Sequence, residues 1–165
     1  MGEHSQPATS FPATQIVLAF DFGLRRIGIA VGDTLTRTAA PRPASLMRAG
    51  GPDWQAIEGE VRAMRPQRLL VGVPHHADGT PSTLAQAARD FGEALHSRFG
   101  LPVEHVDEWG SSLEAGARLK QGRAQGTRSR RVTRADIDST AAAIILERWL
   151  SGECLPSTRA APEAV

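Results

Sequence analysis

Residues Ile16–Asp33 read IVLAFDFGLRRIGIAVGD. Two apolar runs, rich in β-branched residues, flank a short turn at residues 22–25, and each run has the length of a buried strand. Strands joined by so short a turn must pair antiparallel. The stretch therefore predicts two paired strands, the first of which ends on Asp21.

The residues that follow predict a third strand and then alternating helices and strands. The third strand is expected near residues 38–46, at a sheet edge, because Pro41 and Pro43 cannot donate ladder hydrogen bonds. Apolar periodicity and breakers predict the later elements in the order helix, strand, helix, strand, helix, helix, at about residues 54–64, 68–73, 84–99, 101–106, 112–121 and 136–150.

This order of elements predicts one α/β domain. The first three strands are antiparallel, and the strands reached through helical crossovers are parallel. We expect a mixed five-stranded sheet with helices on both faces, which is the plan of the RNase H-like fold. The domain is expected to occupy residues 15–150, between flexible tails at residues 1–14 and 151–165.

The composition favours a cytoplasmic protein. No run approaches the ~20 apolar residues of a membrane span, and residues 1–14 lack the apolar stretch of a signal peptide. The single cysteine, Cys154, excludes an internal disulfide framework and a clustered thiolate zinc site. We therefore expect no membrane partner.

Three acidic residues are expected to meet at one edge of the sheet. Asp21 ends the first strand, Glu108 follows the last strand, and Asp138 lies in the first turn of the final helix. Functional groups in open α/β sheets gather at the carboxyl ends of strands. Clustered carboxylates raise one another's pKa values, and bound Mg²⁺ or Mn²⁺ relieves this repulsion. The pattern predicts a divalent-metal site of the kind that cleaves phosphodiesters.

Each acid also has a purely structural interpretation. Asp21 suits a turn, Glu108 suits a solvated loop, and Asp138 suits a helix start, where the macrodipole favours an acid. Asp21 is the least ordinary of the three because it extends an apolar strand. A carboxylate there is costly unless a cation or hydrogen-bond donors satisfy it.

A strongly basic segment runs from Ser111 to Arg134, although the net charge of the whole chain is only +1. Glu114 is its single acid. The segment favours a polyanion-binding surface, and the alternative is a solvated, partly disordered loop. Its basic residues are Arg118, Lys120, Arg123, Arg128, Arg130, Arg131 and Arg134.

Four short motifs resemble, in order, those of the YqgF family, also called RuvX, which comprises pre-16S rRNA nucleases and RuvC-like Holliday-junction resolvases. Together they span residues 16–150, and four motifs in the right order are more specific than any one of them. The motifs are DFGLRRIGIA at 21–30 followed by Asp33, VGVP at 71–74 with DGT at 78–80, DE at 107–108 with SS at 111–112 and Ala115, and Asp138 followed by AAAIIL at 141–146.

The resemblance implies a divalent-metal nuclease that matures the 5′ end of 16S rRNA. It assigns catalysis and metal binding to Asp21, Glu108 and Asp138. It matches Arg25 and Arg26 to a basic pair that would hold phosphate oxygens, for which the alternative is a solvated turn. The basic segment would then reach the same face, and its residues expected to bind substrate are Lys120, Arg123, Arg128, Arg130 and Arg131.

Two positions depart from the family pattern. Trp109 stands where the family usually has arginine, and its indole is expected to pack against the sheet, with stacking on an unpaired base as the alternative. His76 stands where the family usually has asparagine, and with its neighbour His75 it is expected to face solvent, with a contact to phosphate or the replacement of a polar link as the alternative.

Several functions stay open. The first is a nuclease acting on structured pre-16S rRNA, in a ribosomal precursor particle or alone. The second is a resolvase of four-way DNA junctions, which requires a symmetric homodimer instead of a monomer. The third is a non-catalytic nucleic-acid-binding module, a reading that Trp109 favours. Actin-like ATPases share the fold but need two such domains, and no phosphate loop ending in Gly-Lys-Ser/Thr is present.

Overall fold

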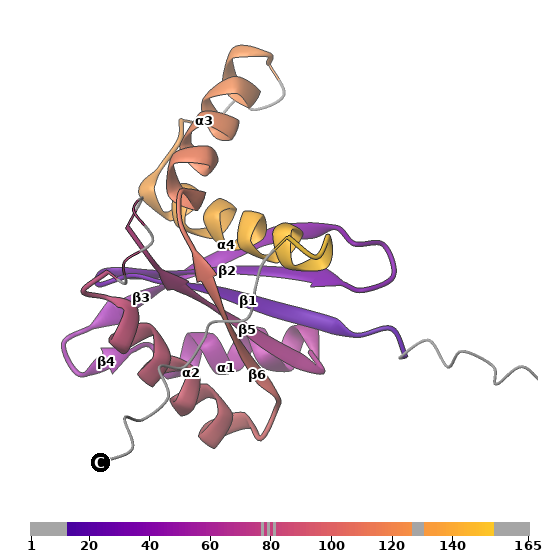
Figure 1. Cartoon of the computed structure of the whole chain (residues 1–165), viewed down its shortest axis with the longest axis vertical. Helices are drawn as coiled ribbons and strands as arrows, with labels where there is room; N and C mark the ends of the chain where they lie inside the picture. Colours follow the sequence, from indigo (N-terminus) through magenta and orange to yellow (C-terminus); the bar gives the residue numbers. More distant parts are fainter. Residues whose placement is uncertain (1–12, 77, 79, 81, 127–130, 154–165) are drawn as a thin grey trace, which may run out of the picture.

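A mixed sheet forms the centre of the molecule (Figure 1). The computed structural model describes residues 13–153 except 77, 79, 81 and 127–130. Within this described part, the strands are β1 (Ile16–Phe22), β2 (Arg26–Asp33), β3 (Ala39–Arg48), β4 (Gly51–Pro52), β5 (Arg68–Pro74) and β6 (Val103–Glu108), and the helices are α1 (Trp54–Met64), α2 (Ala85–Phe99), α3 (Ser111–Ala124) and α4 (Arg134–Leu150).

The described strands lie in the order β4-β3-β2-β1-β5-β6. β1 pairs antiparallel with β2, and β2 pairs antiparallel with β3. β5 lies parallel to both β1 and β6, as helical crossovers require. The mixed sheet and the order of elements are therefore as predicted, with three antiparallel strands first.

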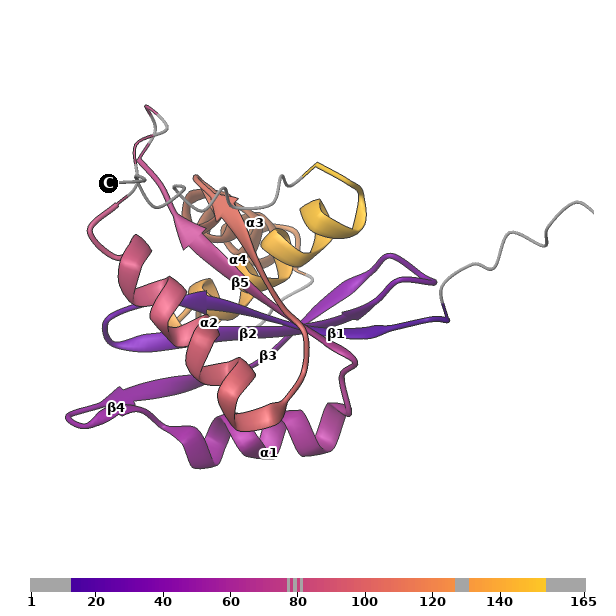
Figure 2. The ribbon, with the colours of Figure 1, turned by 60° about the horizontal axis from the view of Figure 1, so that its bottom comes forward.

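The strand β1 is buried on both faces because helices cover both sides of the sheet. Leu18 and Phe20 pack on the face that α1 and α2 cover, and Val17 and Ala19 pack on the face that α4 covers. Figure 2 shows α1 and α2 on one side of the sheet and α4, with α3 beyond it, on the other. This two-sided cover explains why β1 is a continuous apolar run.

The strand β4 corrects the expected sheet of five strands to six within the described residues. β4 has two residues, which is too short for an alternating pattern to reveal. It pairs only with Met47 and Arg48 of β3, so Pro41 and Pro43 still lie on an open edge, as predicted.

The helix α4 begins two residues earlier than expected. Thr133 is its N-cap and forms a reciprocal capping box with Asp136. Because the helix starts at Arg134, Asp138 lies in the second turn and not in the first. The helix-dipole interpretation therefore suits Asp136, which caps the helix, and leaves Asp138 without that structural explanation.

Parts of the sequence predictions lie beyond the described residues. The flexible tails fall largely on residues 1–12 and 154–165, which the structure does not describe. The division into a domain at residues 15–150 and two tails stays a prediction.

Candidate active site

Asp21 lies on β1 between two glycines of the neighbouring strands. Gly28 of β2 and Gly72 of β5 are its partners in the sheet. Strand alternation places Asp21 on the same face as Val17 and Ala19, which is the face that α4 covers. The carboxyl group therefore has no side chain beside it on either neighbouring strand.

Gly28 is the point at which α4 rests on the sheet. A Cβ atom at residue 28 would lie 1.9 Å from the carbonyl oxygen of Asp138 and 2.9 Å from the backbone nitrogen of Ser139. Only glycine allows so close an approach of two backbones. The helix therefore brings Asp138 next to Asp21 because the residue between them has no side chain.

Glu108 approaches Asp21 from the opposite side, over Gly72. A Cβ atom at residue 72 would lie 3.7 Å from the Cβ of Glu108 and 2.8 Å from Cδ1 of Ile145 on α4. Glu108 is 8% exposed, and its Oε1 accepts a hydrogen bond of 2.7 Å from the backbone N–H of Ser111. Ser111 is the first residue of α3, whose N-cap is Gly110, so the Glu108 carboxylate satisfies a helix N–H that Gly110 cannot.

The three acids interact electrostatically. Burial raises the pKa of Asp21 well above its usual value, and the charges of Glu108 and Asp138 raise it further. Asp21 accepts no hydrogen bond from any residue that the structure describes. An ionised Asp21 is therefore destabilised, and a cation or a proton at its carboxyl would relieve it.

The two predicted phosphate-binding arginines lie differently. Nε of Arg26 donates a hydrogen bond of 2.8 Å to Oδ2 of Asp138, across 112 residues of sequence. Arg26 is half-buried, whereas Arg25 is exposed in the turn between β1 and β2. Arg26 thus belongs to the acidic cluster, and Arg25 is the arginine of this pair that is open to a phosphate group.

Arg148 of α4 is a site residue that the sequence reasoning missed. Its Nη1 lies 3.9 Å from Oε1 of Glu108 and donates to the carbonyl oxygen of Trp109 at 3.3 Å. Asp138, Ile145 and Arg148 follow one another at helical spacings of seven and three residues, so they form one stripe of α4. The helical spacing could have pointed to Arg148, but only with the knowledge that Glu108 lies next to the Arg148 end of this stripe.

The predicted basic surface is only partly described. Lys120 and Arg123 are exposed on the second half of α3, which projects away from the sheet (Figure 1). A rise of about 1.5 Å per residue places Arg123 about 18 Å along α3 from Ser111. Arg131 is exposed just before α4, and Arg128 and Arg130 lie outside the described residues.

The structure corrects the predicted environments of Trp109 and His75. Trp109 does not pack against the sheet: it is 53% exposed, and its ring forms a T-shaped pair with the His75 ring, with 6.1 Å between the ring centroids. His75 does not face solvent: its side chain is 7% exposed, and its Nδ1–H donates to the carbonyl oxygen of Val73 at 2.9 Å. His76 is exposed, as predicted. At the turn after β6, the Trp109 indole is therefore exposed and the His75 imidazole is buried.

Comparison with known proteins now decides the family. A family model described as RuvX, Holliday junction resolvase, matches residues 15–152. This chain belongs to the RuvX family. A protein of Azotobacter vinelandii is 43% identical over 138 residues, which cover 83% of this chain and 94% of that one. A protein of Nitrosococcus oceani is 43% identical over 150 residues, which cover 88% and 91% respectively, and both carry the name "Putative pre-16S rRNA nuclease".

A solved structure confirms the RNase H-like fold of the RuvX chain. The structure of T. thermophilus RuvC in complex with a Holliday junction substrate matches it with a TM-score of 0.50 and 14% sequence identity. The match covers 87% of this chain and 99% of that one.

Within the described residues, no helix is long and apolar enough to cross a membrane.

The donor set of the RuvX site suits a hard divalent cation. It consists of three carboxylates, and Asp21 has no hydrogen-bond donor among the described residues. Among the residues that the structure describes, however, no three His, Cys, Asp or Glu side chains are arranged to hold a metal ion. Asp138 is turned to Arg26, and Glu108 is turned to Ser111 and Arg148. A cation would have to compete with Arg26 for the Asp138 carboxylate.

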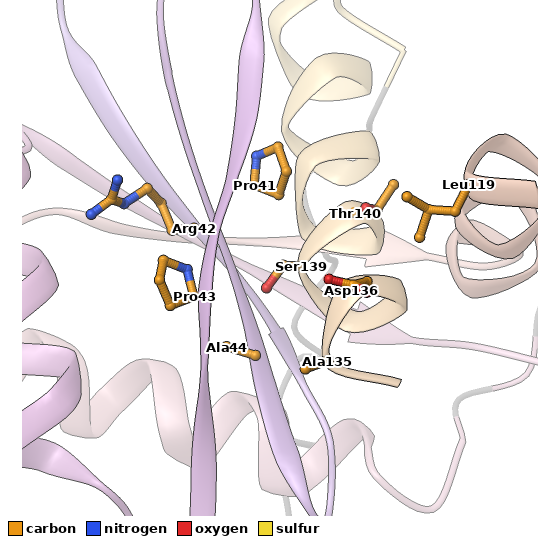
Figure 3. A pocket seen from close by; sticks show the side chains of 9 residues that line it. All are labelled: Pro41, Arg42, Pro43, Ala44, Leu119, Ala135, Asp136, Ser139 and Thr140. Atoms are coloured by element: carbon orange, nitrogen blue, oxygen red, sulfur yellow. The ribbon is translucent and has the colours of Figure 1, made fainter. Parts of the chain in front are cut away.

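A separate cavity of about 370 Å³ is lined by none of Asp21, Glu108 and Asp138. Pro41 and Pro43 of β3, Leu119 of α3, and Ser139 and Thr140 of α4 are among its lining residues (Figure 3). Asp138 does not line it. The cavity therefore belongs to the junction of β3, α3 and α4, and the acidic cluster is a different place in the RuvX chain.

Proposed function

We propose that this protein is a divalent-metal-dependent nuclease that processes the 5′ end of pre-16S rRNA. The observation that carries the proposal is the environment of Asp21: a destabilised carboxyl without a hydrogen-bond donor among the described residues, flanked by Glu108 and Asp138. Membership of a family described as resolvases supports phosphodiester cleavage, and the names of the relatives support the RNA substrate.

The proposed mechanism assigns a task to each residue. Asp21, Glu108 and Asp138 would bind Mg²⁺ or Mn²⁺, which supplies Lewis-acid activation of water and of the leaving oxygen. Arg25, exposed in the turn that follows Asp21, holds a phosphate oxygen of the substrate. Arg26 neutralises Asp138 before the cation binds.

The basic residues of the α3 region hold the substrate backbone. Lys120 and Arg123 are exposed on α3, Arg131 is exposed beside α4, and Arg128 and Arg130 complete the predicted set. Such contacts act on phosphates and give no sequence preference of their own. We propose that the protein works in the cytoplasm on structured RNA or on ribosomal precursor particles, as a monomer or homodimer.

Binding should depend steeply on salt, and this dependence should weaken in the double variant Lys120→Ala/Arg123→Ala. Each lost phosphate contact removes counterion release, so the slope of log K against log salt should fall by about 0.7–0.9 per residue. Fluorescence anisotropy with labelled RNA leader at several salt concentrations measures the slope. An unchanged slope would show that the distal half of α3 does not touch the substrate.

The proposal is tested by cleavage of two matched, labelled substrates. Precursor 16S 5′ leader RNA and a mobile four-way DNA junction are each incubated with the protein in Mn²⁺, Mg²⁺ or EDTA. We expect the RNA to be cut only with metal. Symmetric cuts in the junction alone would assign resolvase activity, the second candidate, which the family description favours. Binding of both substrates without cleavage of either would refute the nuclease and leave a binding module.

A further inference from the structure

We propose that Arg148 is a positioning residue for Glu108, supplying from α4 the positive charge that residue 109 does not provide. The inference rests on the proposed nuclease function and adds a residue to its site. It concerns the orientation of one carboxylate, and it involves neither substrate binding nor the identity of the substrate.

The two oxygens of the Glu108 carboxylate have different surroundings. Oε1 accepts the N–H of Ser111 at 2.7 Å and lies 3.9 Å from Nη1 of Arg148. Oε2 accepts no hydrogen bond from a described residue. The side chain is 9% exposed, so water satisfies little of its charge. The described residues thus engage one oxygen of Glu108 and leave the other without a hydrogen bond.

The Arg148 guanidinium is itself held in place. Its Nη2 donates to Oε2 of Glu114 on α3 at 2.5 Å, and its Nη1 donates to the carbonyl oxygen of Trp109 at 3.3 Å. Glu114 also pairs with Arg118. The planar guanidinium carries donors on both terminal nitrogens, so Nη2 contacts Glu114 while Nη1 contacts the carbonyl oxygen of Trp109 and faces Glu108. Arg148 therefore has a defined orientation beside Glu108.

The side chain at position 109 takes no part in these contacts. Trp109 offers its carbonyl oxygen to Arg148, while its indole is 53% exposed and meets His75. The positive charge next to Glu108 consequently comes from a residue 40 positions later in the chain. An arginine introduced at position 109 would directly follow Glu108 in the chain. The inference can therefore be tested by removing the arginine at position 148 and adding one at position 109.

The test compares Arg148→Ala with Glu147→Gln, its neighbour on α4. Glu147 pairs with Arg118 of α3, and its carboxylate makes no ion pair with Arg148 and lies in no contact with Glu108 among the described interactions of the two helices, so its variant removes only a link between α3 and α4. Arg148→Ala should weaken Mn²⁺ binding, measured by isothermal titration calorimetry, by about 10- to 100-fold. Its kcat should fall by a similar factor with KM for RNA unchanged. Glu147→Gln should keep the native Mn²⁺ affinity and kcat.

Two further variants make the outcome decisive. Arg148→Lys keeps the positive charge and most of the side-chain length, so it disturbs the fold less than Arg148→Ala. It should show an intermediate loss of Mn²⁺ affinity. Trp109→Arg added to Arg148→Ala should restore part of both the affinity and the kcat. Arg148→Ala and Arg148→Lys with native Mn²⁺ affinity and kcat would overturn the inference and leave the nuclease proposal intact. A native protein that neither binds Mn²⁺ nor cuts either substrate would overturn both.

Discussion

Asp21→Asn is expected to abolish metal-dependent cleavage and, without metal, to raise the melting temperature. Burial and the charges of Glu108 and Asp138 raise the pKa of Asp21 in the folded protein. The folded state thus binds this proton more tightly than the unfolded state, whose pKa is about 3.9. Stability falls as the pH rises from that value through the folded pKa, and the full cost persists above it. Asparagine has nearly the same shape and never carries this charge.

The stability of this variant is measured by thermal unfolding in EDTA at pH 7 and at pH 3.5. At pH 7 the variant should melt higher, and each kcal/mol gained corresponds to about 2–4 °C for a domain of this size. At pH 3.5 the difference should shrink, because Asp21 is then protonated in the folded state and mostly protonated in the unfolded state. Mn²⁺ should raise the melting temperature of the native protein by mass action and leave that of the variant nearly unchanged.

The activity of this variant is measured on the RNA leader with Mn²⁺. The loss of a metal ligand removes several kcal/mol of transition-state stabilisation, which corresponds to about 10³-fold or more in rate. Asp90→Asn is the matched control, since Asp90 is exposed on α2 and its carboxylate accepts a hydrogen bond from Gln86 of the same helix. A variant that is less stable than the native protein at pH 7 in EDTA would show that the folded chain already satisfies the ionised carboxylate.

Gly28→Ala is expected to cost both stability and activity. The new Cβ would lie 1.9 Å from the carbonyl oxygen and 2.3 Å from the carbonyl carbon of Asp138. These are backbone atoms of α4, so no side-chain rotation relieves the clash and the helix must move. Overpacking of a core typically costs about 1–3 kcal/mol, and because α4 packs on several strands of the sheet, this variant should lie at or above the upper end.

The expected loss is about 3 kcal/mol, or about 6–12 °C in melting temperature. Cleavage should be lost even at temperatures where the variant is folded, because Asp138 moves with the helix. Gly59→Ala is the control, since nothing lies within 4 Å of a Cβ at that position of α1 and alanine favours a helix by about 1 kcal/mol. A Gly28→Ala protein with native melting temperature and activity would show that α4 does not rest on β2 at this point.

The fold and the three acids could be predicted because their signals are local. The apolar run before Asp21 and the short turn after it specify two antiparallel strands without reference to the rest of the chain. The start of α4 could also have been predicted from the sequence, since Thr133 and Asp136 have the spacing of a capping box. The prediction placed that start two residues late and so assigned Asp138 to the wrong turn. The strand β4 left no signal because two residues show no period.

The partners of the acids could not be predicted because they are distant in sequence. Arg26 and Asp138 are 112 residues apart, and their pairing exists only when α4 lies across β2. The same packing brings Arg148 to Glu108. The burial of His75 and the exposure of Trp109 likewise depend on how β6 leads into α3.

By itself, the sequence determined the order of the strands and helices along the chain and placed Asp21 and Glu108 near the ends of two strands and Asp138 near the start of the last helix. Hydrophobic periodicity is a property of neighbouring residues, so it survives without the fold. The tertiary structure alone decided that Gly28 and Gly72 leave room around Asp21 and that Arg26 and Arg148 neutralise the other two acids. These features depend on close contacts between segments that are distant in the chain, where the absence of a Cβ atom or the position of one guanidinium sets the geometry. No local sequence pattern predicts such contacts.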